Sequence, residues 1–293
     1  MSDTPTLDID GLHLSIGTTP ILRDVSLQLR RGRIMGLVGE SGGGKTMVGK
    51  AVLDVLPDVA RITAGSIKFE GRDLLSMTQR QRRLLRGKSI SMILQNPMSA
   101  LNPAFRIEHQ MVDVMRFHLG IGAREARERA RDMLDAVQIR DPDRVLRLYP
   151  HELSGGMCQR VVISIAFSCE PQLIIADEPT TALDVTVQHQ ILKLIKVMQA
   201  RTNSAVLFIT HDLGVVAKVC DTIAVLYAGM ILEAGPVEKI FAAPAHDYTR
   251  ALMNAAPRYD RPNALLRSIP AALREKLQQD ARAYDQTRVF AHA

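Results

Sequence analysis

The strongest constraint on the fold of this chain is a glycine-rich stretch, residues 39–46, that follows a short apolar run. It matches the full pattern G-x-x-x-x-G-K-[ST] of the phosphate-binding P-loop. Residues 34–38 before it are apolar and predict a buried parallel strand, and residues 47–56 after it predict a helix that stops before Pro57. The motif therefore has the strand–loop–helix context that phosphate binding needs, which favours an α/β fold.

The residue types of this loop explain what it would bind. Glycines let successive backbone N–H groups turn towards phosphate oxygens, and a helix N-terminus favours the same anion. Lys45 would supply a positive charge to the β- and γ-phosphates of a nucleotide, and the Thr46 hydroxyl would ligate Mg²⁺. The residues expected to bind nucleotide in this loop are Gly39, Glu40, Ser41, Gly42, Gly43, Gly44, Lys45 and Thr46.

Composition limits the class of protein. The chain has 293 residues, 46% of them hydrophobic, which suffices for one large domain with an extension or for two small domains. The longest apolar runs fall well short of the roughly 18 residues of a membrane span, and the polar N-terminus is unlike a signal peptide. The three cysteines, Cys158, Cys169 and Cys220, form no C-x-x-C pair, so neither a zinc site nor a disulfide framework is expected.

Basic residues gather in two segments, 72–88 and 124–131, while the net charge is +6. They are open to three interpretations: a nucleic-acid surface, solvated helix faces, or a face turned to an anionic membrane surface. Aromatic residues make up 4% of the chain and are not interleaved with these charges, which argues against nucleic acid. Solvated helix faces are the preferred interpretation, and no nucleic-acid partner is expected.

The order of the predicted elements indicates the architecture. Apolar residues alternate in 12–16 and again in 25–29, around a turn at 17–20, and predict an antiparallel β layer that 65–69 extends. Residues 90–94 read as a core strand. Helical spacing in 124–137 then predicts an inserted helical subdomain. From residue 161 helix and strand alternate, as in a parallel α/β sheet, over 161–167, 173–176, 187–198 and 205–209, with further strands at 222–227 and 230–234. From Pro236 on, an extension is expected to pack partly on the core and to fray at its end.

A second anion site is predicted where Ser154, Gly155 and Gly156 open the apolar helix near Val161. The alternative is that Ser154 only caps this helix. A cap does not require two consecutive glycines, so the exposed backbone favours a phosphate contact.

Two carboxylates follow the apolar run 173–176. Asp177 would hold Mg²⁺, directly or through water, and Glu178 would polarise an attacking water molecule. Adjacent acids after a strand are also common in turns, so the presence of the P-loop in the same chain is what favours the functional interpretation.

These stretches together resemble a known family. The segment 153–159 is similar to the signature motif of ATP-binding-cassette (ABC) ATPases, and the rest of their motifs stand in order between Leu7 and Pro257. Gln95 resembles the Q-loop glutamine, residues 182–184 the D-loop, and His211 the switch histidine. The resemblance implies a P-loop NTPase fold with a RecA-like core, and it implies ATP and Mg²⁺ as cofactors. It also implies Glu178 and His211 as catalytic residues, metal contacts at Thr46, Gln95 and Asp177, and nucleotide contacts at Ile16, Gln95, Ser154, Gly155, Gly156, Gln159 and Asp184.

Segments 95–103, 176–188 and 247–252 look like those of the peptide and nickel importers. The resemblance implies an ATP-hydrolysing subunit on the cytoplasmic face of the inner membrane, which energises import of peptides, metal chelates, opines or related solutes. Its partners would be two permease subunits, a second ATPase (a copy or a paralogue) in a head-to-tail dimer, and, indirectly, an extracytoplasmic solute-binding protein. The nucleotide-binding domain would span 1–257, with the helical subdomain at about 96–158 and the extension at 258–293. The alternatives are a soluble ABC protein acting on ribosomes or DNA, and a non-hydrolysing module.

The chain departs from the family pattern at Ile16, where an adenine-stacking aromatic is usual. Weaker base selectivity, or an aromatic supplied from elsewhere, is expected. Many peptide-importer ATPases also carry a cysteine-rich C-terminal segment, in some cases with an iron–sulfur cluster. Here no cysteine follows Cys220, so no such cluster is expected.

Overall fold

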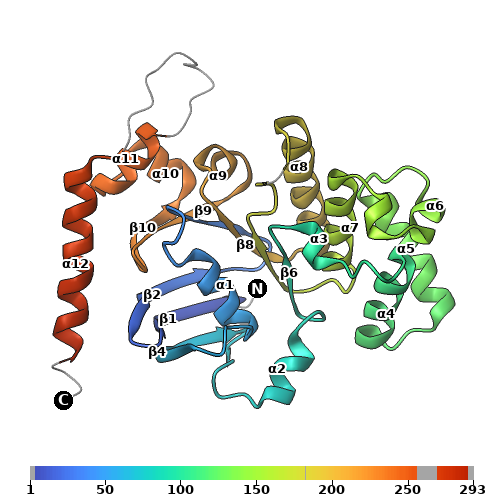
Figure 1. The fold of residues 1–293 in the computed structure, drawn as a ribbon, viewed down its shortest axis with the longest axis horizontal. Coiled ribbons are helices and arrows are strands. Elements are labelled where there is room, and N and C mark those ends of the chain that lie inside the picture. The colour runs from blue at the N-terminus through green and yellow to red at the C-terminus, as the bar shows by residue number, and fades with distance from the viewer. Residues whose placement is uncertain (1–3, 182, 256–268, 290–293) are drawn as a thin grey trace. The chain divides into compact units, whose positions relative to one another are not determined.

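The computed structural model describes residues 4–181, 183–255 and 269–289 (Figure 1). Its contacts divide the chain into two compact units. The first consists of residues 1–76 and 208–293, and the second of residues 77–207. The second unit is therefore inserted into the sequence of the first, and the chain returns to the first unit within a strand, β8 (Ala205–Thr210).

The first unit contains the predicted antiparallel β layer. Its strands are β1 (Leu7–Ile16), β2 (Thr19–Leu29), β4 (Ala60–Phe69) and β5 (Arg72–Asp73), in the order β2-β1-β4-β5. Both β1–β2 and β1–β4 pair antiparallel, as expected from their alternating apolar residues. β4 begins five residues earlier than predicted, at the buried Ala60, after which exposed and half-buried residues alternate.

The same unit holds the strand that precedes the P-loop. β3 (Ile34–Val38) is buried at every residue and runs parallel to β9 (Thr222–Tyr227). β9 pairs antiparallel with β10 (Met230–Pro236) across the turn at Ala228. The helix after the P-loop, α1 (Lys45–Leu53), begins two residues earlier than predicted and ends three residues earlier, because Asp54 takes a left-handed conformation that ends it.

The segment after Pro236 packs partly on the core, as expected, with Val237, Ile240 and Tyr248 in a core cluster, while its end at 290–293 lies outside the described residues. It contains α10 (Val237–Ala242), α11 (Asp247–Ala255) and the long helix α12 (Ala271–Val289) (Figure 1). Of α12, Leu277 and Ala281 are buried, one turn apart, and Leu277 belongs to a core cluster that includes Tyr227 and Tyr248. So narrow an apolar stripe gives little helical periodicity in the sequence. The predicted domain boundary at 257/258 lies outside the described residues.

The second unit begins with α2 (Gln79–Leu85) and the core strand β6 (Ile90–Ile93), which pairs parallel with β7 (Leu173–Asp177). Between these strands lie α3 (Pro97–Ala100), α4 (Ile107–Leu119), α5 (Ala123–Ala136), α6 (Pro142–Arg147), a 3-10 turn (Pro150–Glu152) and α7 (Gly155–Phe167). α8 (Val185–Thr202) follows β7 and leads into β8. The predicted apolar face of α5 is buried at Ala126, Ala130, Met133 and Leu134.

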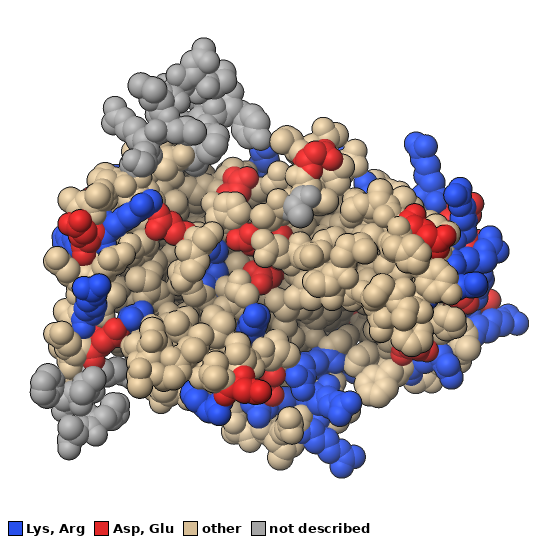
Figure 2. Space-filling model, viewed as in Figure 1, with Lys and Arg blue, Asp and Glu red and all other residues tan. Residues whose placement is uncertain are grey.

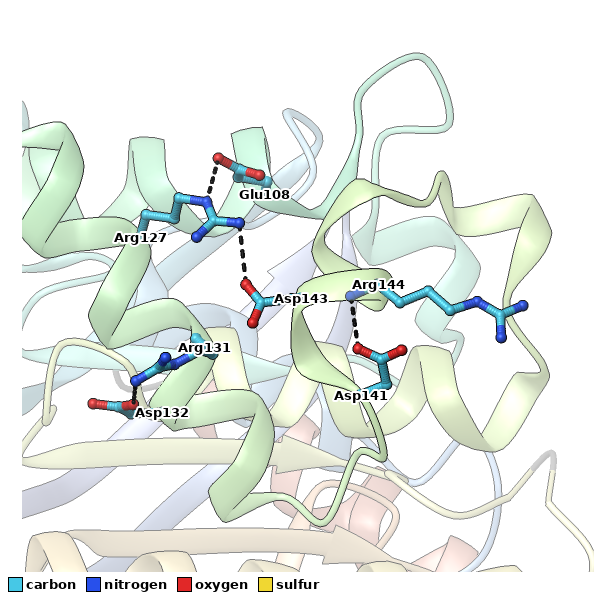
Figure 3. Close-up of polar contacts among 7 residues, drawn as sticks. All are labelled: Glu108, Arg127, Arg131, Asp132, Asp141, Asp143 and Arg144. Atoms are coloured by element: carbon cyan, nitrogen blue, oxygen red, sulfur yellow. Dashed lines mark hydrogen bonds and ion pairs between the residues drawn. The ribbon is translucent and has the colours of Figure 1, made fainter.

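The basic segments are largely helix surfaces of the second unit. Figure 2 shows Lys and Arg gathered over α2 and along α4 to α6. In α5, Arg127 lies between Glu108 of α4 and Asp143 of α6, at 3.2 and 3.1 Å (Figure 3). Arg129 pairs with Glu170 at 2.8 Å. These acids balance the charge within the unit, which favours the interpretation of a solvated helix face. In the described ranges, no helix combines the length and apolar character that a membrane crossing requires.

Candidate nucleotide-binding site

The P-loop is closed by its own lysine. The buried Lys45 ammonium donates hydrogen bonds to the carbonyl oxygens of Gly39 and Glu40, both at 2.9 Å. The Glu40 carbonyl also accepts the Gly43 N–H at 3.2 Å. The loop thus wraps around a positive charge, which is the arrangement that a phosphate chain would exploit.

Glycine is required in this loop for close backbone packing. A Cβ atom at Gly39 would lie 2.0 Å from the Leu226 carbonyl oxygen of β9. Gly44, with a φ of +102°, caps α1, and a Cβ there would lie 2.8 Å from Leu22 Cδ2. The turn between β9 and β10 also contacts the loop, because the Gly229 N–H donates to the Gly43 carbonyl at 3.1 Å. Neighbouring strands therefore hold the loop in place.

The residues present fit a nucleotide and its metal ion. Ser41 and Gly42 are exposed and Gly43 is half-buried, so the outer part of the loop is open to an anion at the N-terminus of α1. Thr46 lies in the first turn of α1 and is also half-buried. An open loop around a buried ammonium suits phosphate oxygens, and the adjacent hydroxyl suits Mg²⁺.

The second unit holds the predicted carboxylates. Asp177 is buried at the last position of β7, and Glu178 follows it. Gln95 comes two residues after the parallel neighbour β6, so both side chains leave the same edge of the sheet. The Gln95 amide donates to the Glu178 carboxylate at 3.1 Å, and the Thr181 hydroxyl donates to it at 2.8 Å. The structure therefore brings Gln95 and Glu178 together, and it adds Thr181, which sequence analysis missed.

The backbone at Glu178 is in the left-handed region, with φ at +46°. For a residue with a side chain this conformation costs roughly 1 kcal/mol or more. It is held by the turn in which the Thr181 N–H donates to the Glu178 carbonyl at 3.3 Å. Strain of this kind gathers at functional sites, so the geometry supports a chemical role for Glu178.

The signature segment begins with a helix cap at Ser154. The Ser154 hydroxyl accepts the Met157 N–H at 3.3 Å. A Cβ at Gly155 would meet nothing within 4 Å, whereas one at Gly156 would lie 3.1 Å from Val187 of α8. Gly156 is therefore explained in part by packing, while Gly155 leaves backbone open to a ligand. Next to them, burial raises the pKa of the Cys158 thiol.

Further sequence-predicted residues occupy different environments. Gln159 is 1% exposed, and its amide has no hydrogen-bond partner among the described residues. A contact with nucleotide would require this side chain to become exposed. Asp184 caps α8 by accepting the Val187 N–H at 2.9 Å, a role that sequence analysis did not assign. Its predicted D-loop neighbour Ala182 lies outside the described residues. His211 follows β8 and is exposed.

Ile16 ends β1, where it pairs with Thr19 and is half-buried. An aliphatic side chain there can contact a base but cannot stack on it as an aromatic ring does. We expect Ile16→Tyr to tighten ATP binding several-fold, since base stacking is worth about 1–3 kcal/mol. Titration of the purified chain with ATP and GTP measures this, with Ile16→Val as control. Wild-type preference for ATP as strong as that of Ile16→Tyr would contradict the prediction.

A P-loop after β3, with carboxylates at the end of β7 and a glutamine after β6, defines a P-loop nucleoside triphosphatase. Comparisons with known proteins narrow this class. A family model described as "ABC transporter" matches residues 22–181, and one described as "Oligopeptide/dipeptide transporter, C-terminal region" matches residues 232–283.

Named relatives agree with these models. The chain is 49% identical to the probable D,D-dipeptide transport ATP-binding protein DdpD of Escherichia coli, over 92% of this chain and 84% of that protein. It is 43% identical to the oligopeptide transport ATP-binding protein OppD of Salmonella typhimurium, over 90% and 80%. Among solved structures, the dimeric post-hydrolysis cassette MJ0796 with ADP and Pi superposes with a TM-score of 0.69 at 23% identity, over 79% of this chain and 98% of that one. CbiO1 of Clostridium perfringens gives 0.72 at 23%, over 88% and 97%.

The chain belongs to the ABC transporter family, among the ATP-binding proteins of the oligopeptide and dipeptide type. The predicted ABC ATPase fold is confirmed by the structural neighbours. The relatives support an ATPase subunit of a transporter and give no support to a soluble ABC protein acting on ribosomes or DNA.

Proposed function

We propose that this chain binds and hydrolyses ATP to energise import of peptides or related small solutes through a membrane permease. The observation that carries the proposal is a P-loop lysine together with two strand-end carboxylates, in a chain 49% identical to a probable D,D-dipeptide transport ATP-binding protein. The buried Lys45 lies in an open P-loop, and the Glu178 carboxylate is held by Gln95. These are the groups on which hydrolysis, rather than mere nucleotide binding, depends.

Each side chain has a proposed task. Lys45 and the P-loop amides bind the β- and γ-phosphates. Thr46, Asp177 and Gln95 would hold Mg²⁺, which neutralises phosphate charge when bound. Glu178 orients a water molecule and accepts its proton, while His211 donates a hydrogen bond to the γ-phosphate. The Gln95–Glu178 contact supports this division, because it keeps the carboxylate oriented before substrate arrives.

The signature residues are proposed to act on a second subunit. Ser154, Gly155, Gly156 and Asp184 would contact the nucleotide held by the P-loop of a partner ATPase in a head-to-tail dimer. The open space around Gly155 supports such a contact, whereas the burial of Gln159 makes its part in it indirect. ATP would favour the closed dimer because its γ-phosphate completes both half-sites.

The helical subdomain, about 96–158, is proposed to contact the permease. Met98 and Phe105, in the segment that follows Gln95, are large exposed apolar side chains. Exposed apolar groups of this kind suit coupling helices of two permease subunits. The chain would thus lie at the cytoplasmic face of the inner membrane, with a solute-binding protein acting on the other side. We keep 1–257 as the proposed nucleotide-binding domain and 258–293 as its extension.

Affinity purification from detergent-solubilised native membranes tests the transport function. Tagged full-length chain is captured, and its partners are identified by mass spectrometry. Two permeases, with or without a related second ATPase, are the expected result, and the presence of the second ATPase decides between a paralogue and a second copy. Recovery of ribosomal or DNA-repair components without a membrane protein would overturn the proposal. The cargo would then follow from the ligand of the accompanying solute-binding protein.

A further inference from the structure

The C-terminal helix α12 contacts the P-loop directly. Arg274, in the first turn of α12, pairs with the Glu40 carboxylate at 2.7 Å. Glu40 belongs to the P-loop, and its carbonyl oxygen accepts both the Lys45 ammonium and the Gly43 N–H. Arg274 lies 234 residues from Glu40 in the sequence, so this pair joins a distant helix to the P-loop.

Near its other end, α12 makes a second contact, which leads to the P-loop indirectly through β2. Asp285 binds Arg23 of β2 through both carboxylate oxygens, at 2.7 and 2.8 Å, with exposed side-chain fractions of 26% and 12%. Arg23 also donates from its side chain to the Ala228 carbonyl at 2.7 Å, and from its backbone to the Gly229 carbonyl at 2.8 Å.

The turn at 228–229 transmits this contact to the loop, because the Gly229 N–H donates to the Gly43 carbonyl at 3.1 Å. The turn packs closely on β2, since a Cβ at Gly229 would lie 2.0 Å from the Ile21 carbonyl oxygen. Asp285, Arg23, the turn and Gly43 thus form a continuous series of hydrogen bonds. The two anchors on α12 are 11 residues apart, about 16 Å of helix, and each leads to the P-loop.

Tyr248, in the helix before α12, also lies near Glu40. Tyr248 of α11 is fully buried and packs on Tyr227 of β9, with ring centroids 4.7 Å apart. Burial first, and then the nearby Glu40 carboxylate, raise the pKa of Tyr248. Glu40 is thus an acidic residue of the P-loop, and its carboxylate pairs with Arg274 at 2.7 Å. Without it, a carboxylate of the loop would face bound phosphates with its charge uncompensated.

We propose that Arg274 and Asp285 are positioning residues through which α12 sets the affinity of the P-loop for ATP. The inference rests on the proposed ATPase function and adds to it a role for the C-terminal helix. Arg274 compensates the charge of Glu40 and orients its peptide, and Asp285 holds Arg23 against the turn that supports Gly43. Neither residue touches the nucleotide.

Full-length variants test this by calorimetric titration with Mg-ATP and by phosphate release over a range of ATP concentrations. Arg274→Ala is expected to raise both Kd and KM for ATP about threefold to tenfold, since a half-exposed ion pair is worth at most about 1 kcal/mol and a freed carboxylate adds repulsion. Asp285→Ala should raise them about threefold. The double variant should show the product of the two effects, because the contacts are separate. The value of kcat should stay within about twofold.

Control variants separate positioning from simple damage. Arg282→Ala is the control for Arg274→Ala, and Asp280→Ala is the control for Asp285→Ala. Each removes an exposed residue of the matching charge from the same helix and should leave Kd unchanged. Arg274→Lys should restore most of the affinity. Raising the salt concentration should narrow the difference in Kd for ATP between wild type and Arg274→Ala, since salt screens an exposed ion pair.

Three outcomes would overturn the inference: an unchanged Kd in both single variants, an equal loss in Arg282→Ala, or a loss of affinity that only follows a lower melting temperature. The readouts also separate this inference from the proposed function. A wild-type chain that binds ATP but releases no phosphate would refute the ATPase, while the titrations would still decide the role of α12.

Discussion

Glu178→Gln is expected to lower ATP turnover by about 10²–10⁴-fold, the typical contribution of a general base, while ATP affinity stays within about threefold. The amide is isosteric with the carboxylate, so the left-handed backbone and the turn to Thr181 should persist. It cannot accept a proton from water, however. In a head-to-tail dimer, bound ATP would then remain intact and keep the subunits together.

Phosphate release measures turnover, and size-exclusion chromatography with light scattering in Mg-ATP measures whether the subunits stay together. Thr181→Val is a useful companion, because it removes the hydroxyl that donates to Glu178 and leaves the carboxylate in place. It should lower turnover less than Glu178→Gln does. Wild-type turnover in Glu178→Gln would remove Glu178 from the reaction and leave the carboxylate of Asp177 as the candidate.

Gly39→Ala should strongly destabilise the fold. Its Cβ would lie 2.0 Å from the Leu226 carbonyl, a backbone atom of β9 that cannot move without breaking the sheet. We expect a loss of about 3 kcal/mol or more in the free energy of unfolding, together with loss of ATP binding. Urea unfolding followed by circular dichroism, and titration with ATP, measure the two effects.

Gly155→Ala is the matched control, because the added Cβ would meet nothing within 4 Å at the start of α7. Its stability should equal that of wild type within about 0.5 kcal/mol. A Gly39→Ala chain as stable as Gly155→Ala would mean that β3 and β9 are not packed against the loop as described.

The elements that were predicted well are those whose signal is local. β3 was predicted with its bounds, because an apolar run before a P-loop has one interpretation. The buried face of α5 followed from residues spaced at helical intervals. α12 was missed because Leu277 and Ala281 alone give no clear stripe, and because its polar anchors meet β2 and the P-loop through contacts distant in sequence.

The site shows the same division. The P-loop residues could be assigned from their pattern, and Gln95 from its resemblance to a family. The hydrogen bond from Gln95 to Glu178 forms because β6 and β7 are neighbours in the sheet. That pairing of strands is known only from the sheet register. The packing of Gly156 on Val187 depends on how α7 meets α8, and the burial of Gln159 depends on tertiary packing, and the motif carries no information about either.

At residue 178, the left-handed backbone lowers the stability of the fold, while the carboxylate side chain is needed for turnover. Glycine there would relieve roughly 1 kcal/mol of conformational strain, and it would also remove the carboxylate. A library of this chain screened for heat resistance alone would therefore accumulate inactive variants at this position. A library screened for growth on the imported solute would lose the same variants. The two selections would therefore favour different residues at this position.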